Sequence, residues 1–320
     1  SIYLHKQTQS ANAKSLVAIM ALQTVQGDTL QVSAAGDDAE AAITALVTLL
    51  ADGCGEAVAA RVEVVEPVLP ESSATLLRGV CASPGSAFGQ VVQVAEPDLN
   101  ITEAGADEAV ERATLERGLR EATEALQVLQ AKAVGSAQAE IFRAHQELLE
   151  DPTLLEQAHE SLAQGKSAAF AWNSATVATA TLFQGLGNTL LAERAADLAD
   201  VGQRVLKLIL GIKDSTWDLP EQAILIAEQL TPSQTASLDT RKVLGFVTVG
   251  GGATSHVAIL ARALGLPAIC GVPVQVLELV NGKQVLLDAD KGELHLEPNL
   301  DEIEQLQATR DALNAARTAC

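Results

Sequence analysis

The sequence predicts an α/β protein in which a helical bundle is inserted between two strand-forming regions. Three observations carry this prediction. Apolar, β-branched segments of strand length occur in residues 76–99 and return after residue 218. Between these regions, apolar residues recur at helical spacing to about residue 211. Ahead of them, residues 1–54 alternate strand and helix patterns and therefore predict a further, smaller α/β unit.

Five helices are predicted in the inserted region. The first carries an apolar stripe whose members lie 4, 3, 4 and 3 residues apart: Leu115, Leu119, Ala122, Leu126 and Leu129. Such a stripe faces partner helices. The other helical stretches cover approximately residues 138–150, 153–163, 166–184 and 189–210. The sequence therefore predicts a bundle rather than isolated surface helices.

The predicted strands flank this bundle on both sides. Residues 76–99 contain a turn at "SPGSAFG", and the strands after residue 218 are "AILIA", "VLGFVTV", "PAICGV", "QVLLDAD" and "ELHLEP". In residues 1–54, "SIYLHKQ" and "DTLQVSAAG" predict two strands, while "SANAKSLVAIMALQ" and "DDAEAAITALVTLLADG" predict two helices. Residues 55–75 contain two prolines and predict a linker, and residues 299–320 predict a closing amphipathic helix.

Composition narrows the classes of function. The 320 residues carry 41 acidic and 21 basic side chains, which gives a formal net charge of −20. No segment concentrates Lys and Arg with aromatic residues, so a nucleic-acid surface is not expected, whereas a basic partner is compatible with this charge. The four cysteines have no metal-ligand spacing, which favours a reducing cytoplasm and no metal site. No apolar run has the length of a membrane-spanning helix.

The stretch "VGGGATSHVAILARALGLPAICG", residues 249–271, combines a strand end, three glycines and a helical pattern. Glycine permits positive φ angles and lets a ligand approach the bare backbone. Thr254 or Ser255 can cap the following helix, which places His256 in its first turn. Backbone N–H groups and the dipole at a helix N-terminus favour a phosphoryl group, and they also favour the neutral imidazole over the imidazolium.

Local chemistry favours His256 as the nucleophile over the two hydroxyls of this turn. A serine or threonine hydroxyl needs an adjacent base, whereas a neutral imidazole needs none, and its phosphoramidate is labile enough to be passed on. The motif is not a Walker loop, because no lysine follows the glycines. These residues alone leave two interpretations open: His256 is either a reacting group or only the neighbour of a helix cap.

The segment "LTPSQTASLDTRKVLGFVTVGGGATSHVAILARALGLPAICG" resembles the phosphohistidine segment of the phosphoenolpyruvate-protein phosphotransferases, the enzyme I family. The likeness continues upstream through "GVCASPGSAFG", "AEIFRAHQELLEDPTLLEQA" and "LLAERAADLADVGQRVLKLILG", and covers residues 76–320 in the family's order. One departure lies before Thr254, where stand-alone enzyme I has an arginine and this chain has Ala253. The resemblance implies a swivelling phosphohistidine α/β subdomain at residues 76–100 and 212–298, with a carrier-docking helical subdomain at residues 101–211.

The resemblance also implies roles for particular residues. His256 is expected to accept phosphate from phosphoenolpyruvate and to donate it to the carrier HPr, with Thr235 of "TPSQT" holding the imidazole ring. The phosphate loop is expected to contain Gly251, Gly252, Thr254 and Ser255. By position, the carrier-facing surface of the helices is expected to contain His145, Leu148, Leu154 and Arg194, although each is also compatible with an ordinary core or surface role.

Residues 1–54 are similar to the latter two thirds of HPr. Ser15 occupies the place of the regulatory serine of some HPr proteins, and the loop with HPr's own phosphohistidine is expected before Ser1. His5 lies on the wrong strand to replace that histidine. An HPr domain ahead of an enzyme I domain is the pattern of multiphosphoryl transfer proteins of the sugar phosphotransferase system. Tethering places acceptor and donor at an effective concentration of roughly millimolar.

The sequence is also compatible with alternative functions, and two features of the complete family are not expected in this chain. The nearest alternative is the phosphotransferase subunit of the dihydroxyacetone kinase system, and another is a docking or regulatory module without turnover. A swivelling domain of a pyruvate phosphate dikinase is less compatible, because those enzymes lack the inserted helices. No cofactor is expected in this chain. The family's C-terminal barrel, which binds phosphoenolpyruvate and magnesium, is expected after Cys320, so that this chain alone would not take phosphate from phosphoenolpyruvate.

Overall fold

The computed structural model describes ten stretches of the chain: residues 1–25, 27–53, 72–73, 75–94, 99–133, 136–186, 189–212, 219–236, 238–253 and 255–299. The chain divides into two compact units. The first contains residues 1–66, 100–127 and 143–213, and the second contains residues 67–99, 128–142 and 214–320. The predicted closing helix lies outside the described residues, and so does nearly all of the predicted linker.

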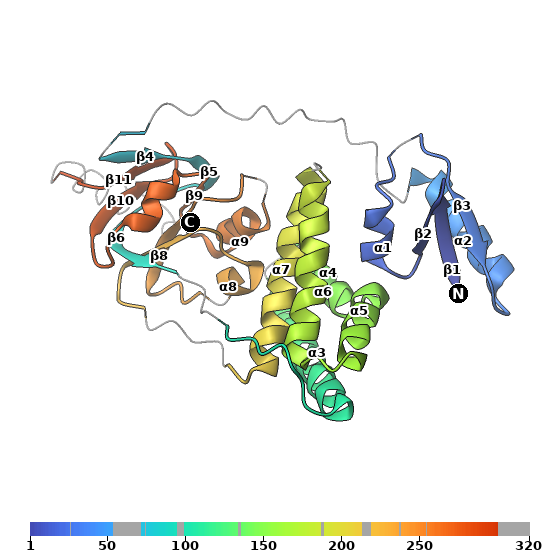
Figure 1. The fold of residues 1–320 in the computed structure, drawn as a ribbon. Coiled ribbons are helices and arrows are strands. Elements are labelled where there is room, and N and C mark those ends of the chain that lie inside the picture. Colours follow the sequence, from blue (N-terminus) through green and yellow to red (C-terminus); the bar gives the residue numbers. More distant parts are fainter. Residues whose placement is uncertain are drawn as a thin grey trace. The chain divides into compact units, whose positions relative to one another are not determined.

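The N-terminal part of the first unit is a small antiparallel sheet with two helices. Its strand order is β2-β1-β3, and Figure 1 shows these strands with the two helices in blue. The elements are β1 (Ile2–Lys6), β2 (Gln9–Asn12), α1 (Leu16–Ala21), β3 (Gln31–Ala34) and α2 (Ala39–Ala51). Leu4, Ala11 and Leu22 form its buried core, which partly buried apolar residues of α1, β3 and α2 extend.

This part differs from the sequence prediction by one strand. The segment predicted as the start of a helix begins instead with β2, which pairs with β1 from Tyr3↔Asn12 to Lys6↔Gln9. The hairpin turn contains Gln7 at φ 55°, a left-handed conformation that Gly or Asn adopts more readily. Because the usual turn residues are missing, the pattern gave no sign that the strand reverses.

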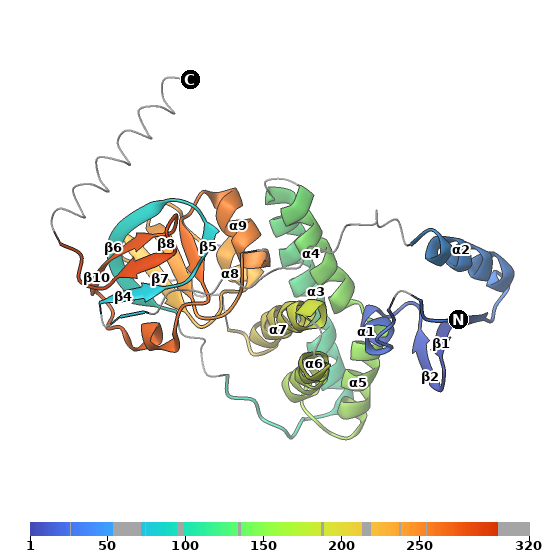
Figure 2. The same ribbon diagram turned by 90° about the horizontal axis from the view of Figure 1, so that it is seen from above.

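The helices of the inserted bundle confirm the prediction, and all of them except residues 128–142 belong to the first unit. They are α3 (Glu108–Lys132), α4 (Ser136–Leu149), α5 (Pro152–Ala163), α6 (Ala168–Gly185) and α7 (Thr189–Ile209). Leu115, Ala122 and Leu126 of the predicted stripe are fully buried. Helices α6 and α7 lie side by side, as Figure 2 shows nearly end-on. The buried Trp172 joins them, because its indole N–H donates to Gly202 O at 3.2 Å.

The second unit is built on an eight-stranded sheet of order β4-β11-β10-β6-β7-β8-β9-β5. Strands β6 to β9 pair in parallel, and the remaining pairs are antiparallel. The strands are β4 (Leu76–Arg78), β5 (Val80–Ser83), β6 (Ser86–Gln93), β7 (Ala223–Ala227), β8 (Val243–Thr248), β9 (Ala268–Cys270), β10 (Gln284–Asp288) and β11 (Glu293–His295). Every strand segment predicted from the sequence is present, so the α/β fold with an inserted bundle is confirmed.

Alternation along the strands divides the interior of the second unit between the two faces of the sheet. Ile224, Ile226 and Val247 contribute to one cluster, which the 3-10 helix η2 (Val274–Glu278) covers. Leu225 and Phe246 contribute to the other cluster, which α9 (His256–Leu264) covers. The short helix α8 (Pro232–Ala236) contacts α9, and both appear on the same side of the sheet in Figure 1. None of the described helices is long and apolar enough to cross a membrane.

Candidate functional site

The glycine turn begins where β8 ends at the carboxyl edge of the parallel strands. Its first half is held by two hydrogen bonds: Gly250 N donates to Glu228 O at 2.8 Å, and Thr248 Oγ1 donates to Gly250 O at 2.8 Å. Gly251 has φ 90°, a conformation that side-chain-bearing residues rarely adopt. Around Gly252 there is open space where a side chain would lie. The turn therefore leaves bare backbone beside the helix that follows.

His256 is the first residue of α9 and so lies in the first helical turn, where the sequence places it. Ser255 is the N-cap, with its Oγ accepting from Ala258 N at 3.3 Å, and its own N–H donates to Gly252 O at 3.1 Å. Thr254, the other predicted cap, lies outside the described residues. The His256 side chain is partly exposed. The imidazole is therefore carried on the first turn of a nine-residue helix, where backbone N–H groups and the helix dipole favour an anion.

Thr235 lies on α8, which follows β7, while His256 lies on α9, which follows β8. Because β7 and β8 are neighbouring parallel strands, both helices start from the same edge of the sheet. Thr235 is fully buried, and its hydroxyl donates to Thr231 O at 2.9 Å. That bond uses the only hydroxyl proton, so towards a further group Thr235 can act only as an acceptor. The predicted contact of Thr235 with the imidazole stays a prediction.

A second nucleophile lies beside the glycine turn. The Cβ of Cys270 is 3.9 Å from the point where a Cβ on Gly251 would lie. Burial is the main cause that raises the pKa of the Cys270 thiol to about 11, and the nearby Cys81 contributes. Near neutral pH Cys270 is therefore an uncharged thiol, which is a poor nucleophile. The Cys270 thiol therefore does not compete with His256 for a phosphoryl group.

Within the first unit, the HPr-like segment contacts the bundle through Ser15 and Asp151. The hydroxyl of Ser15 donates to Asp151 Oδ1 at 2.8 Å and accepts from Thr153 Oγ1 at 2.8 Å. It also accepts from Ala18 N at 2.9 Å, as the N-cap of α1. Ser15 is completely buried and Asp151 is 2% exposed. The one donor and two acceptor sites of this hydroxyl are therefore all used.

Asp151 caps two helices at once. Oδ1 accepts from Thr153 N at 2.9 Å at the start of α5, and Oδ2 accepts from Val17 N at 3.0 Å at the start of α1. A carboxylate at a helix N-terminus is stabilised by the free N–H groups and the dipole, and here two helices contribute. The sequence shows Asp151 followed by Pro152, a recognisable helix start. The contact between Ser15 and Asp151, which are 136 positions apart in the chain, has no local sequence pattern that predicts it.

The four predicted carrier-facing residues occupy different settings. His145, Leu148 and Leu154 are at most 2% exposed, in a structure where the HPr-like segment contacts α5. The side chain of Arg194 is 31% exposed and donates to Asp197 Oδ2 at 3.1 Å. A surface that faces a carrier would expose these three side chains, but they are buried and pack inward. Their role towards a carrier stays a prediction.

The imidazole of His145 lies between two buried carboxylates of α7. Its Nε2 is 3.4 Å from Asp197 Oδ1 and its Nδ1 is 3.6 Å from Asp200 Oδ2. Arg194 contacts the same Asp197 through its Oδ2. Two carboxylates that face each other without a partner repel, and burial intensifies the repulsion. His145 therefore joins α4 to α7 inside the bundle.

His145→Ala is expected to destabilise the bundle by about 3 kcal/mol, the usual cost of removing one partner of a buried charged group. Urea unfolding followed by tryptophan fluorescence, to which the buried Trp172 contributes, measures this loss. His159→Ala, on the partly exposed face of α5, is the control and is expected to change the unfolding free energy by less than about 0.5 kcal/mol. Equal stability of the His145 variant and the parent would show that the imidazole does not support the bundle.

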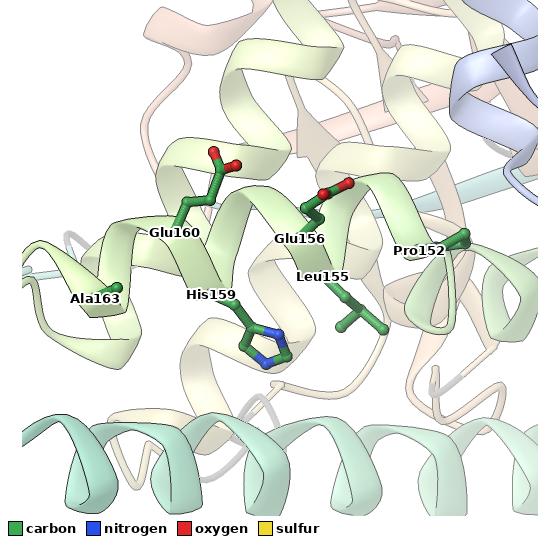
Figure 3. Close-up of a pocket in the computed structure, with 6 residues that line it drawn as sticks. All are labelled: Pro152, Leu155, Glu156, His159, Glu160 and Ala163. Carbon is green, nitrogen blue, oxygen red and sulfur yellow. The ribbon is translucent and has the colours of Figure 1, made fainter.

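A shallow hollow lies on α5 beyond Asp151. Six residues of this helix line it: Pro152, Leu155, Glu156, His159, Glu160 and Ala163. Figure 3 shows the carboxylates of Glu156 and Glu160 on one side of α5, with Leu155 and His159 directed to the other. The two carboxylates give this helix an acidic surface that suits a basic partner. Among the described residues, His, Cys, Asp and Glu side chains form no group that could hold a metal ion.

Three known sequence families match the chain in succession. Residues 1–52 match the family described as the PTS HPr component phosphorylation site. Residues 78–194 match the N-terminal domain of PEP-utilising enzymes, and residues 219–292 match their mobile domain. A solution structure of enzyme I is 33% identical over 74% of this chain and 99% of that chain, with a TM-score of 0.57. The chain belongs to the enzyme I family.

Some relatives of this enzyme I family member match its HPr-like segment as well as the remainder of the chain. A multiphosphoryl transfer protein of Rhodobacter capsulatus is 36% identical over 99% of the chain and 40% of its own length. One of Xanthomonas campestris pv. campestris is 36% identical over 91% of the chain and 36% of its own length. The phosphoenolpyruvate-protein phosphotransferase of Bacillus subtilis is 32% identical over 75% of the chain and 43% of its own length. The chain thus spans less than half the length of these relatives.

Proposed function

We propose that the chain is a phosphoryl relay of the phosphoenolpyruvate-dependent sugar phosphotransferase system. His256 accepts a phosphoryl group that originates from phosphoenolpyruvate and passes it to a histidine of HPr. The observation that carries this proposal is the position of His256 as the first residue of α9, directly after a glycine turn and beside the capping Ser255. The order of the three matched families along the chain supports it.

The chemistry at His256 is an exchange of one bond to phosphorus for another. A neutral ring nitrogen uses its lone pair to attack phosphorus, and the bond from phosphorus to the donor oxygen or nitrogen breaks. The donor leaves with that electron pair. Passing the group on to HPr reverses these roles. The N-terminal turn of α9 stabilises the negative charge of the transferring group in both directions.

Thr235 is proposed to hold the imidazole of His256 through its hydroxyl oxygen. Because that hydroxyl donates to Thr231 O, the ring nitrogen that faces it has to carry the proton, which leaves the lone pair on the other nitrogen. Thr235→Val keeps the shape and removes the acceptor. We expect transfer to slow about 10-fold or more, as loss of an orienting group does. Rapid-quench transfer from phospho-HPr measures the rate, and an unchanged rate would contradict the proposed contact.

The contact between Ser15 and Asp151 is proposed to be the carrier-docking contact, made here by the chain's own HPr-like segment. Its support is the pair of buried hydrogen bonds that Asp151 accepts from Ser15 and Val17. His145, Leu148, Leu154 and Arg194 are proposed to shape the same part of the bundle. Ser15 is proposed as a regulatory site, because a phosphate on its hydroxyl would face the carboxylate of Asp151.

The remaining partners and cofactors are proposals as well. Phosphoenolpyruvate and magnesium are expected at a C-terminal domain of the full-length protein, and the described residues offer no metal site. The dihydroxyacetone kinase subunit is not favoured, since multiphosphoryl transfer proteins align with 99% and 91% of this chain.

Transfer from phospho-HPr tests the function. HPr is phosphorylated with a complete phosphotransferase and labelled phosphoenolpyruvate, purified, and mixed with the chain. We expect acid-labile, base-stable label on the chain. A docking module without turnover is the second candidate, favoured by the buried Ser15–Asp151 contact. It would bind HPr in an NMR titration and take no label, and that result would overturn the relay.

A further inference from the structure

Arg262 ties the glycine turn to strand β5. Its Nη1 donates to Ala253 O at 3.0 Å and to Ala82 O at 2.6 Å. Ala82 lies on β5, and Ala253 lies in the turn, three residues before His256. One guanidinium nitrogen therefore joins the turn to the edge strand of the sheet. Arg262 and Ala82 are 180 positions apart in the chain.

The second half of the turn depends on this contact more than the first half does. Near its start, Gly250 is held through both N and O, by Glu228 and Thr248. Gly251 and Gly252 follow, and glycines lose more conformational freedom on ordering than any other residue. Beyond them, Ser255 N donates to Gly252 O at 3.1 Å within the turn, and Arg262 holds Ala253 O from the last turn of α9. The same helix thus carries His256 at its start and the restraint on the preceding backbone at its end.

We propose that Arg262 is a positioning residue for phosphoryl transfer at His256. It fixes the backbone that enters α9 and thereby the direction of the imidazole, without contacting the phosphoryl group. The proposal rests on the proposed function, since it presumes that His256 is the residue that takes the phosphate. A charged donor on a carbonyl makes a stronger hydrogen bond than a neutral one, which suits a restraint on a glycine-rich segment.

Arg262→Met keeps much of the length of the side chain and removes both hydrogen bonds. We expect the rate constant for transfer at saturating phospho-HPr to fall about 100-fold, as small misplacements of a reacting group cause. The half-saturating concentration of phospho-HPr is expected to stay unchanged, because the proposed docking contact is at Asp151 and not at this residue. Arg262→Lys retains a charged donor and is expected to recover part of the rate.

The matched control is Arg241→Met. Arg241 is an exposed arginine of the same unit that pairs with Asp239 at 2.9 Å, and its loss is expected to leave the transfer rate unchanged. Imidazole NMR signals of His256 give an independent readout: one set in the parent, and broadened or multiple sets in Arg262→Met. A transfer rate equal to that of the parent, or a change only in the half-saturating concentration, would overturn the proposal.

Two further outcomes separate this inference from the function on which it rests. If Arg262→Met lowers the melting temperature so far that it does not fold, Arg262→Lys decides: the inference requires a reduced rate with unchanged half-saturation, and a parental rate overturns it. If the parent chain itself takes no label, the proposed function fails. If the parent is labelled at His256 and Arg262→Met is equally fast, only the positioning role fails.

Discussion

His256→Ala is expected to abolish the acid-labile phosphorylation of the chain by phospho-HPr. Among the described residues at the start of α9, the imidazole is the only side chain that is nucleophilic without an adjacent base. The thiol of Cys270 is kept uncharged by burial, which raises its pKa to about 11. We expect labelling at least about 1000-fold slower than in the parent, the scale on which loss of a nucleophile acts. Filter-bound label after alkaline and acid washes measures it.

Ser255→Ala is the control for His256→Ala. It keeps the imidazole but removes the hydroxyl that caps Ala258 N, so that the helix start is weakened by about 1 kcal/mol. Label is expected to appear more slowly and to stay acid-labile. Acid-stable label in the parent that disappears in Ser255→Ala would show that the hydroxyl, and not the imidazole, takes the phosphate.

Ser15→Asp is expected to release the HPr-like segment from the bundle. The new carboxylate would lie against Asp151, where the hydroxyl now donates at 2.8 Å in a fully buried contact. A buried unpaired charge costs about 3 kcal/mol or more, which corresponds to a factor above about 100 in the docked fraction. If free HPr uses the same surface of α5, its apparent affinity then rises in proportion to the freed fraction.

The matched comparison for this prediction is Ser15→Asn. Asparagine has the size of aspartate without the charge, and its amide can still donate to Asp151. Titration of isotope-labelled HPr by NMR gives the two affinities. We expect HPr to bind Ser15→Asp at least about 10-fold more tightly than Ser15→Asn. Equal affinities would show that the segment and HPr do not compete for the surface around Asp151.

The sequence predicted the large elements well, because each has a strong local pattern. The stripe of Leu115, Ala122 and Leu126 gave the first bundle helix, and unbroken apolar runs such as "AILIA" gave strands that are buried on both faces. The start of α9 was predicted to within one residue, because glycines followed by Thr254 and Ser255 form a recognisable helix start, and the structure has Ser255 as the N-cap. These features depend on neighbours within a few positions.

Other features depend on distant residues and left no local pattern. Strand β5 pairs with β9, at the opposite end of the sheet from β4, which directly precedes β5 in the chain. Asp151 receives Ser15 from 136 positions away, and two carboxylates enclose His145 from 52 positions or more. Arg262 lies within the segment that resembles the enzyme I family, but its bonds to Ala82 and Ala253 are visible only in the folded sheet.

The most direct test of the relay is to locate the phosphate in the phosphorylated chain. Trypsin cleavage after Lys242 and Arg262 releases residues 243–262, a peptide in which His256 is the only histidine. Digestion at neutral pH after reaction with phospho-HPr, followed by fragmentation that preserves phosphohistidine, is expected to place one phosphoryl group on His256. Phosphate found on a hydroxyl of this peptide or on a different peptide would contradict the relay through His256.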